Sequence, residues 1–367
     1  MNDIPQRPPR ILSIDALRGF DMLLIIFADR FFASLHQGAD TAFTGFLARQ
    51  FEHPEWFGST FYDIIMPLFL FVVGAVIPFS LSQRMQEQNS KGQLYGKLIK
   101  RFIILFILGW IVQGNLLALD AGQFKVFSNT LQAIAVGYVF SCLAFIHLSR
   151  NGRYLLFVFC LLSYALLLTL PQVPGVGRST LMPDQNFALY VDRLVFGPFD
   201  DGLQYTWLLS GLGFTATTLS GLFAGEWIKS DMPRKKVVLY LVAAGLIALS
   251  LGLIWGIWHP IVKKIWSSSF VLASSGVCYL LLAAFYWIID VKGKTAWTFP
   301  LKVIGMNAIT AYVLSHVIDF PAIADDLVFG LEQYSESWYP MWTIIGGFAI
   351  LYSLLWYMYV NKTFVKV

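Results

Sequence analysis

Charged residues are scarce in this sequence of 367 residues. Asp, Glu, Lys and Arg make up 13% of the chain, whereas hydrophobic residues make up 57%. Soluble domains carry about a quarter charged residues, so the composition excludes an ordinary soluble enzyme. The formal net charge of +4 is modest. We therefore expect no nucleic-acid partner.

Cysteine is also scarce, and its placement excludes a thiolate metal site. Cys142, Cys160 and Cys278 lie inside apolar runs without metal-ligand spacing, so we expect buried small residues and no metal. The sequence has no P-loop, dinucleotide fingerprint or Gly-x-Ser-x-Gly elbow, and ATP-driven or redox chemistry has no support. No internal repeat, low-complexity tract or cleavable signal peptide is evident. A single domain over residues 1–367 is the simplest interpretation.

Apolar runs recur along the chain, each of about the 20 residues that a helix needs to cross a membrane. The sequence therefore predicts an all-α polytopic membrane protein with about ten transmembrane helices. The expected spans are residues 14–35, 60–82, 98–119, 128–148, 153–171, 204–228, 236–258, 266–289, 299–319 and 340–361.

Lys and Arg residues favour one orientation of these spans. An even number of spans places both termini on one side. Seventeen Lys and Arg residues fall in the segments on that side and six in the opposite segments. The positive-inside rule then predicts cytoplasmic N- and C-termini, with residues 1–13 as a cytosolic tail. The long loops 36–59 and 172–203 become extracytoplasmic, and loops of that length often carry function.

A histidine precedes the second expected span, and a carboxylate lies within that span. His53 follows Glu52 and is followed by Trp56, while Asp63 comes ten residues later. Histidine titrates close to neutral pH and suits general-base work, and a carboxylate such as Asp63 or Asp29 could orient its imidazole. The alternative interpretation is a solvated loop histidine.

Other polar residues gather at the outer ends of the expected spans. A charge at the bilayer centre costs at least ~2.5–3.5 kcal/mol, so each one needs a partner or a role. These polar residues either form a functional site or belong to ordinary helix ends at the membrane interface. Trp56 could stack on a sugar or belong to the aromatic belt, and Lys264 could bind phosphate or snorkel. The residues are Asp29, Asn115, Gln132, Lys264, His316 and their neighbours.

Asp15 and Arg18 lie three residues apart at the inner end of the first expected span. This spacing predicts a helical i,i+3 pair. The pair is either a structural ion pair or a cytosolic gate or phosphate contact.

Several stretches in order resemble the heparan-α-glucosaminide N-acetyltransferase family of transmembrane acyltransferases and its short bacterial relatives. Each stretch is weak alone, and the ordered set spans nearly the whole chain. This chain has Asp29 where the family often has Asn, Phe57 where an Asn is common, and Ala133 in place of an Arg. The stretches are 13–20, 52–58, 61–71, 131–135, 260–269, 290–293 and 305–308.

The resemblance implies a transmembrane acetyltransferase with a cytosolic acetyl-CoA donor and an extracytoplasmic carbohydrate acceptor. His53 falls on the family's catalytic histidine and Asp63 on its aspartate. The resemblance further suggests a multi-pass protein of the bacterial inner membrane and a homodimer. The acetyl group would pass to an amine or hydroxyl of a sugar or glycan.

The predicted mechanism assigns roles to the polar residues. His53 acts as general base or as a transient acetyl carrier, and Asp63 and Asp29 hold its imidazole. The candidates for binding the acetyl-CoA donor are Arg18, Asn115, Gln132, Lys264 and Asn307. The candidates for binding the acceptor are Glu52, Trp56 and His316.

Two other functions remain open from the sequence. A transporter or flippase of a sugar or lipid-linked sugar would fit Pro67 and Pro78 inside a span, although no inverted repeat is visible. A structural subunit of an envelope assembly would leave His53 and Asp63 replaceable.

Overall fold

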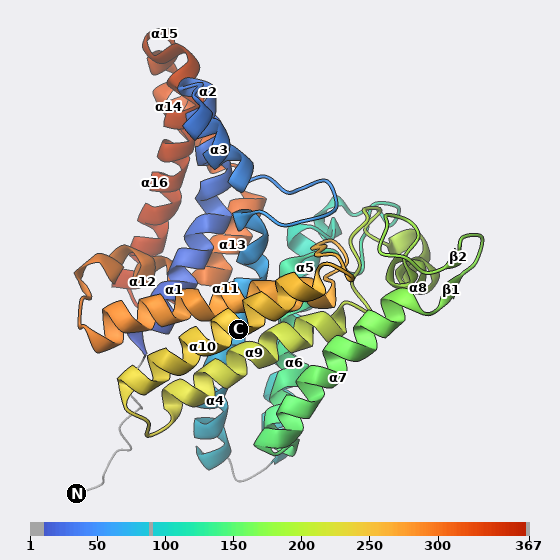
Figure 1. Cartoon of the computed structure of the whole chain (residues 1–367). Coiled ribbons are helices and arrows are strands. Elements are labelled where there is room, and N and C mark those ends of the chain that lie inside the picture. Colours follow the sequence, from blue (N-terminus) through green and yellow to red (C-terminus); the bar gives the residue numbers. More distant parts are fainter. Residues whose placement is uncertain (1–10, 88–90, 365–367) are drawn as a thin grey trace, which may run out of the picture.

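The computed structural model describes residues 11–87 and 91–364, which form a predominantly helical protein (Figure 1). The helices of the first half are α1 (Leu12–Leu23), α2 (Asp29–Gly38), α3 (Ala42–Gln50), α4 (Ile65–Glu87), α5 (Lys91–Val112), α6 (Thr130–His147) and α7 (Arg150–Thr169). Those of the second half are α8 (Phe187–Phe196), α9 (Gly211–Lys229), α10 (Arg234–Trp255), α11 (Ser268–Tyr286), α12 (Phe299–Met306), α13 (Ala308–Val317), α14 (Phe320–Val328), α15 (Glu332–Ser335) and α16 (Tyr339–Val360).

Each expected span coincides with one helix or with two consecutive helices. Within the described ranges, six helical segments are long and apolar enough to cross a membrane by length and composition. An all-α multi-pass membrane protein is thereby supported. The six segments are Phe61–Ser82, Thr130–His147, Arg150–Thr169, Arg234–Trp255, Ser268–Val291 and Phe320–Val360.

Helix breaks distinguish the structure from the expected spans. The first span is a single long rod, in which the π-helical segment Leu24–Ala28 joins α1 to α2. The ninth span is interrupted at Asn307, between α12 and α13. The third span begins and ends earlier than expected, since α5 ends at Val112.

The two long expected loops contain short elements of their own. Residues 36–59 include the end of α2 and all of α3, and Thr41 caps α3. Residues 172–203 include α8 and an antiparallel hairpin of β1 (Gln172–Val173) and β2 (Gly177–Arg178). Residues 1–10 of the expected tail lie outside the described residues.

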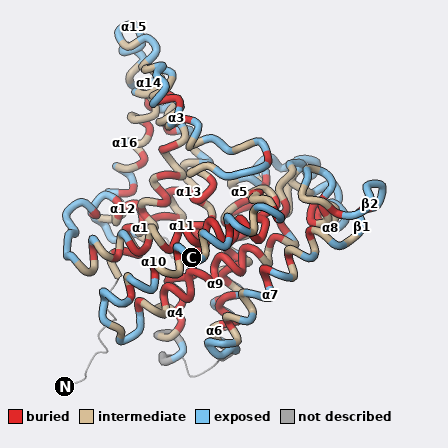
Figure 2. The backbone as a smooth tube through the Cα atoms, in the orientation of Figure 1, coloured by how far each residue is buried: buried red, intermediate tan, exposed pale blue. Residues whose placement is uncertain are grey.

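The core forms where α4 packs against α9 without intervening side chains. A Cβ atom added to Gly221 would lie 1.9 Å from the backbone oxygen of Phe71, and one added to Gly74 would lie 1.9 Å from that of Thr218. Small residues permit this close approach, as in other membrane helix pairs. Figure 2 shows buried residues concentrated along these central helices, while α15 and β2 are largely exposed.

A projection of α2, α3, α14, α15 and part of α16 stands away from the helix bundle (Figure 1). The loop after α3 leaves this projection and returns to α4. Gly58 in this loop donates its N–H to the Ile261 carbonyl over 2.9 Å and has φ of 93°, a backbone conformation that favours glycine. The loop is thereby fixed against residues 256–267, which precede α11.

Candidate active site

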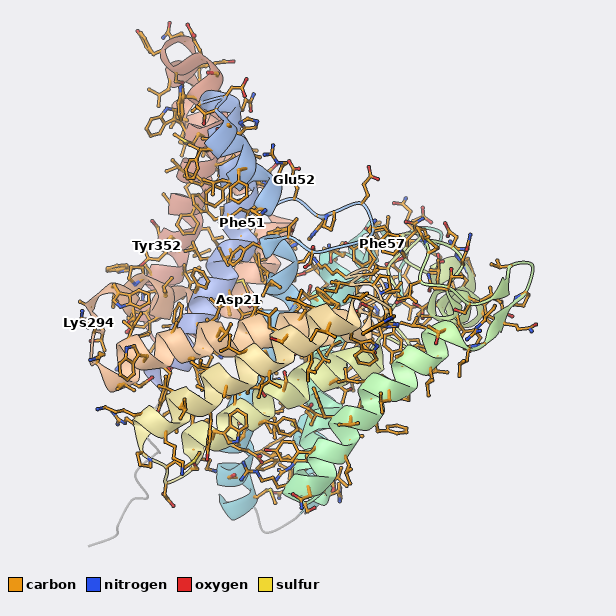
Figure 3. The ribbon with its side chains drawn as sticks, viewed as in Figure 1. Asp21, Phe51, Glu52, Phe57, Lys294 and Tyr352 are labelled. Carbon is orange, nitrogen blue, oxygen red and sulfur yellow. The ribbon has the colours of Figure 1, made fainter. Side chains whose placement is uncertain are left out.

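His53 lies on the loop between α3 and α4, directly above the first turn of α4. Figure 3 labels Phe51, Glu52 and Phe57 along this loop. The Trp56 indole donates to the Leu181 carbonyl over 2.7 Å, and Thr60 Oγ1 donates to the Glu52 carbonyl over 2.8 Å. These bonds hold the loop at both sides of His53.

Asp63 binds the imidazole of His53. Asp63 Oδ1 lies 2.6 Å from His53 Nδ1, and Asp63 Oδ2 accepts the backbone N–H of Thr60 over 3.0 Å. Thr60 and Asp63 form a capping box at the short 3-10 turn that opens α4. Because an ionised carboxylate only accepts hydrogen bonds, the Nδ1 atom carries the proton and Nε2 keeps its lone pair. The sequence therefore caps the helix and orients the imidazole with one carboxylate.

Lys263 completes a three-residue cluster with His53 and Asp63. Its Nζ lies 3.2 Å from Asp63 Oδ1 and 3.3 and 3.4 Å from the Nδ1 and Nε2 atoms of His53. Burial lowers the pKa of the Lys263 ammonium below its ordinary value, and the Asp63 carboxylate partly offsets this effect. A cation at this position can stabilise an oxyanion.

A cavity of about 360 Å³ opens beside this cluster. Its walls come from the π-helical segment, the first turns of α4 and α6, the end of α5, α13 and the loop before α9. Polar and aromatic groups dominate the wall, as expected for a site that binds a polar ligand. The lining residues are Ile25, His53, Tyr62, Ile65, Met66, Gln113, Ser128, Asn129, Thr130, Asp201, Leu203, Tyr205, Trp207, Lys263, Tyr312 and His316.

Asp201 supplies a further carboxylate to the wall of this cavity. Its Oδ2 accepts the indole N–H of Trp207 over 2.6 Å, and its Oδ1 accepts the backbone N–H of Leu203 over 2.9 Å. Burial raises the pKa of Asp201 to about 6. The carboxylate is therefore held rigidly and can accept a hydrogen bond from a ligand.

Comparison with known proteins gives two kinds of match. Residues 10–124 match a family described as "Domain of unknown function (DUF5009)". Heparan-alpha-glucosaminide N-acetyltransferase from Homo sapiens is 26% identical over 373 residues, which cover 85% of this chain and 53% of the relative. The same protein from Mus musculus is 26% identical over 367 residues, covering 84% and 54%.

This chain is similar in sequence to the heparan-alpha-glucosaminide N-acetyltransferases. The resemblance inferred from the ordered stretches is confirmed by these matches. The chain spans about half the length of the curated relatives it matches. Within the described residues, several apolar helices indicate a membrane-spanning protein.

The structure brings some of the predicted acetyltransferase residues together at one cavity. His53 and Asp63 are bonded, and His316 lines the same cavity. Asp29 does not line this cavity but a neighbouring one of about 260 Å³. Tyr62, Ile25 and His316 line both cavities. Tyr62 therefore lies between Asp29 and the cavity of the His53 cluster.

Other predicted residues have structural contacts. Buried Gln132 accepts the Ser128 N–H over 2.8 Å and donates to the Val126 carbonyl over 3.0 Å. Asn115 adopts the left-handed conformation at φ 54° and donates to the Gln123 carbonyl over 2.9 Å. Gln132 and Asn115 therefore shape the turn that precedes α6.

The loop residues near His53 differ in exposure. Glu52 is exposed, whereas Trp56 is buried with 8% of its surface accessible. The Lys264 ammonium lies 5.7 Å from the Trp56 ring and 5.9 Å from the Tyr205 ring. Lys264 thus packs on two aromatic rings next to the cavity.

Arg18 and Asn307 are not among the residues that line the His53 cavity. Arg18 pairs with Asp15 over 2.7 Å on α1, as the i,i+3 spacing predicts. Asn307 is buried at the junction of α12 and α13, and neither amide atom has a hydrogen-bond partner among the described residues.

Sequence reasoning missed Lys263 as a member of the His53 cluster. The sequence has two adjacent lysines, Lys263 and Lys264, and only Lys264 was predicted to bind a ligand. Adjacent loop side chains point in different directions, and Lys263 lies 210 positions from His53. Only the docking of the two loops through Gly58 decides which lysine reaches His53.

Proposed function

We propose that this protein is a membrane acetyltransferase that uses acetyl-CoA to acetylate an amine or hydroxyl of an extracytoplasmic sugar or glycan. The observation that carries the proposal is the Asp63–His53–Lys263 cluster, which opens into a polar cavity on a chain related to named N-acetyltransferases. We propose only the chemical class of the acceptor, a sugar or glycan, because the chain spans about half of the relatives' length.

The proposed reaction uses His53 as a general base. The acceptor N–H or O–H gives its proton to His53 Nε2 while its nitrogen or oxygen bonds to the thioester carbonyl carbon. Asp63 stabilises the imidazolium that forms, and the Lys263 ammonium stabilises the oxyanion. When the C–S bond breaks, the departing thiolate takes the proton from His53. Asp201 would accept a hydrogen bond from the acceptor at the wall of the cavity.

Buried polar atoms on α5 and α13 and at the α12–α13 junction support a route for a polar donor chain. Arg101 Nε, both amide atoms of Asn307 and Thr310 Oγ1 are buried without a hydrogen-bond partner among the described residues. They lie on α5, at the α12–α13 junction and on α13, and α13 packs against both α1 and α5. Unsatisfied polar atoms inside a membrane protein are costly, so a polar ligand beside these atoms would be stabilised.

The proposed topology has ten membrane spans with both termini in the cytoplasm. His53 then lies on the extracytoplasmic side of a bacterial inner membrane, and the donor reaches it from the opposite side. A homodimer is part of the proposal by family resemblance.

The variant Glu52→Cys tests the proposed orientation, because Glu52 is exposed on the loop that carries His53. A maleimide that cannot cross the membrane should label this cysteine in intact cells. Labelling only after permeabilisation would show that the orientation is the opposite one.

The test uses permeabilised membrane vesicles with labelled acetyl-CoA and a panel of amino sugars and glycans. We expect wild type to transfer label to an acceptor and His53→Ala to lose transfer by about 10²–10⁴-fold. His147→Ala is the control, because His147 is exposed at the other end of α6 and bonds Tyr95.

Equal label transfer by wild type and His53→Ala would show that the catalytic assignment is wrong. Movement of an unmodified sugar across sealed vesicles, without acetylation, would support the transporter instead. Label retained on His53 in the absence of acceptor would show that the reaction passes through a transient acetyl-imidazole and not through the general-base step.

A further inference from the structure

A second and larger cavity, of about 700 Å³, lies at the end of the bundle opposite to His53. It is formed by the last turns of α4, α6 and α9 and the first turn of α7. Met66 of the His53 cavity and Pro78 of this one are twelve residues apart on α4, or roughly 18 Å along a helix axis. The lining residues are Pro78, Ser82, Met85, Phe145, Arg150, Arg153, Glu226, Lys229 and Ser230.

Positive charge exceeds negative charge among the described residues of this lining. There, Arg150, Arg153 and Lys229 face one carboxylate, that of Glu226. Arg153 Nη1 pairs with Glu226 Oε1 over 2.9 Å, so one positive charge is compensated within the lining. The other two are not compensated there. An anion would be attracted to this cavity.

The central arginine is rigid and still has hydrogen-bonding capacity. Arg153 is 9% exposed, and its guanidinium lies 4.9 Å from the Phe145 ring. Arg153 Nε and Glu226 Oε2 are buried without a hydrogen-bond partner among the described residues. A fixed guanidinium matches the geometry of phosphate oxygens, so little conformational freedom is lost on binding.

Lys229 is also fixed at the cavity wall. Its ammonium donates to the Pro78 carbonyl over 2.7 Å. An ammonium has three donors, so two remain for a ligand. Arg150 lies on the first turn of α7, where its Nε donates to the Tyr154 hydroxyl over 3.4 Å. Together these side chains surround a space that accommodates a phosphate group.

We propose that this cavity binds a phosphate group, carried either by an anionic lipid headgroup or by a soluble phosphate-bearing ligand. The site lies at the ends of four helices, where headgroups and solvent both have access. Basic pockets between membrane helices commonly take such ligands. This inference does not depend on the acetyl-transfer proposal.

Close packing separates this site from the His53 cavity. Between them, α4 contacts α9 backbone to backbone at Gly221 and Gly74. A Cβ added to Gly137 on α6 would lie 2.4 Å from Thr218 Oγ1 on α9. No room for a connecting ligand remains along α4, α6 and α9, so bound phosphate would act by holding the helix ends together.

The test measures thermal unfolding of the full chain in two settings, with three phosphate-bearing probes. In detergent, adenosine 3′,5′-bisphosphate and inorganic phosphate are titrated. In nanodiscs, phosphatidylglycerol is compared with phosphatidylcholine. We expect at least one probe to raise the unfolding midpoint of wild type. The double variant Arg150→Gln/Lys229→Gln should bind that probe at least about tenfold more weakly, because each lost charge-assisted bond is worth about a factor of ten.

Lys235→Gln is the matched control, since Lys235 is exposed at the same end of the bundle and does not line the cavity. It should respond like wild type. A response to phosphatidylglycerol alone identifies a lipid phosphate, and a response to the soluble probes alone identifies a free ligand. No response by wild type, or an equal response by the double variant, would overturn the proposal.

Discussion

The two ends of the α4–α6–α9 bundle hold cavities that differ in how their charges are compensated. At the end that carries the loop after α3, Asp63, His53 and Lys263 are in mutual contact, and the carboxylate lies beside the lysine ammonium. At the other end, three cations share one carboxylate, and buried polar atoms of Arg153 and Glu226 have no partner among the described residues. The first arrangement suits the movement of a proton, and the second suits the binding of an anion.

The comparison also shows how the two sites are kept apart. The same helices contribute to both, yet the segment between them is packed backbone to backbone. A membrane protein that handles ligands at both faces needs such a seal, because a continuous polar channel would leak ions. Four changes test this division of roles.

Asp63→Asn should have the largest effect. An amide cannot replace the carboxylate as a pure acceptor, so the imidazole would lose both its orientation and its compensating charge. We expect the rate of label transfer to fall by about 10²–10⁴-fold. Asp231→Asn, at an exposed carboxylate at the opposite end, should leave the rate unchanged. A rate within twofold of wild type for Asp63→Asn would remove Asp63 from the mechanism.

Lys263→Met should lower kcat by about 10²-fold, the usual cost of removing one oxyanion donor. Lys294→Met, at an exposed lysine at the other end, is the control. If Lys264→Met lowers kcat to this extent and Lys263→Met does not, the second lysine is the catalytic one.

Gly221→Ala tests the packed segment between the cavities. The added methyl group would lie 1.9 Å from the Phe71 carbonyl oxygen, so α4 and α9 must separate. We expect a loss of about 1–3 kcal/mol in the free energy of unfolding, measured by thermal or denaturant unfolding in detergent. Gly96→Ala on α5 is the opposite case, because nothing lies within 4 Å of its Cβ position. It should raise stability by about 0.5–1 kcal/mol. Equal effects of both changes would contradict the packing argument.

His259 should give an effect that is visible only in acid and absent at neutral pH. Burial lowers the pKa of His259 to about 4, below the ordinary value of 6.5. Between these values the unfolded chain binds more protons than the folded one, so stability falls as the pH falls from 6.5 to 4. The loss can reach about 3 kcal/mol, the free energy equivalent of the pKa difference. Unfolding midpoints at pH 7.5 and 4.5 measure it.

His259→Gln should reduce this acid sensitivity, whereas His147→Gln, at an exposed histidine, should keep it. His259 belongs to the loop that carries Lys263, so acid should loosen the His53 end before the Arg153 end. An identical pH dependence of wild type and His259→Gln would show that this histidine is not the sensitive group.

Much of the helical fold follows from local sequence. Apolar runs of about 20 residues predict helices because only a helix satisfies its backbone hydrogen bonds within lipid. The link between His53 and Asp63 is also partly local, since Thr60 and Asp63 form a capping box that fixes the carboxylate ten residues from the histidine. The π-helical segment Leu24–Ala28 was not predicted, because it contains no Pro or Gly. The break at Asn307 follows Gly305 and was not predicted either, because glycine is frequent inside membrane helices.

The sequence by itself determined a helical membrane chain with an imidazole and a carboxylate near the end of one span, because helix length, capping and hydrophobicity depend on neighbouring residues. Only the tertiary structure decided that Lys263 rather than Lys264 reaches His53, and that Tyr62 lies between Asp29 and the cluster's cavity. It alone assembled the Arg153 cavity from four helix ends. These contacts join residues that are far apart in the chain. Which residues meet depends on how closely the helix backbones pack at small residues, and no local sequence pattern encodes that packing.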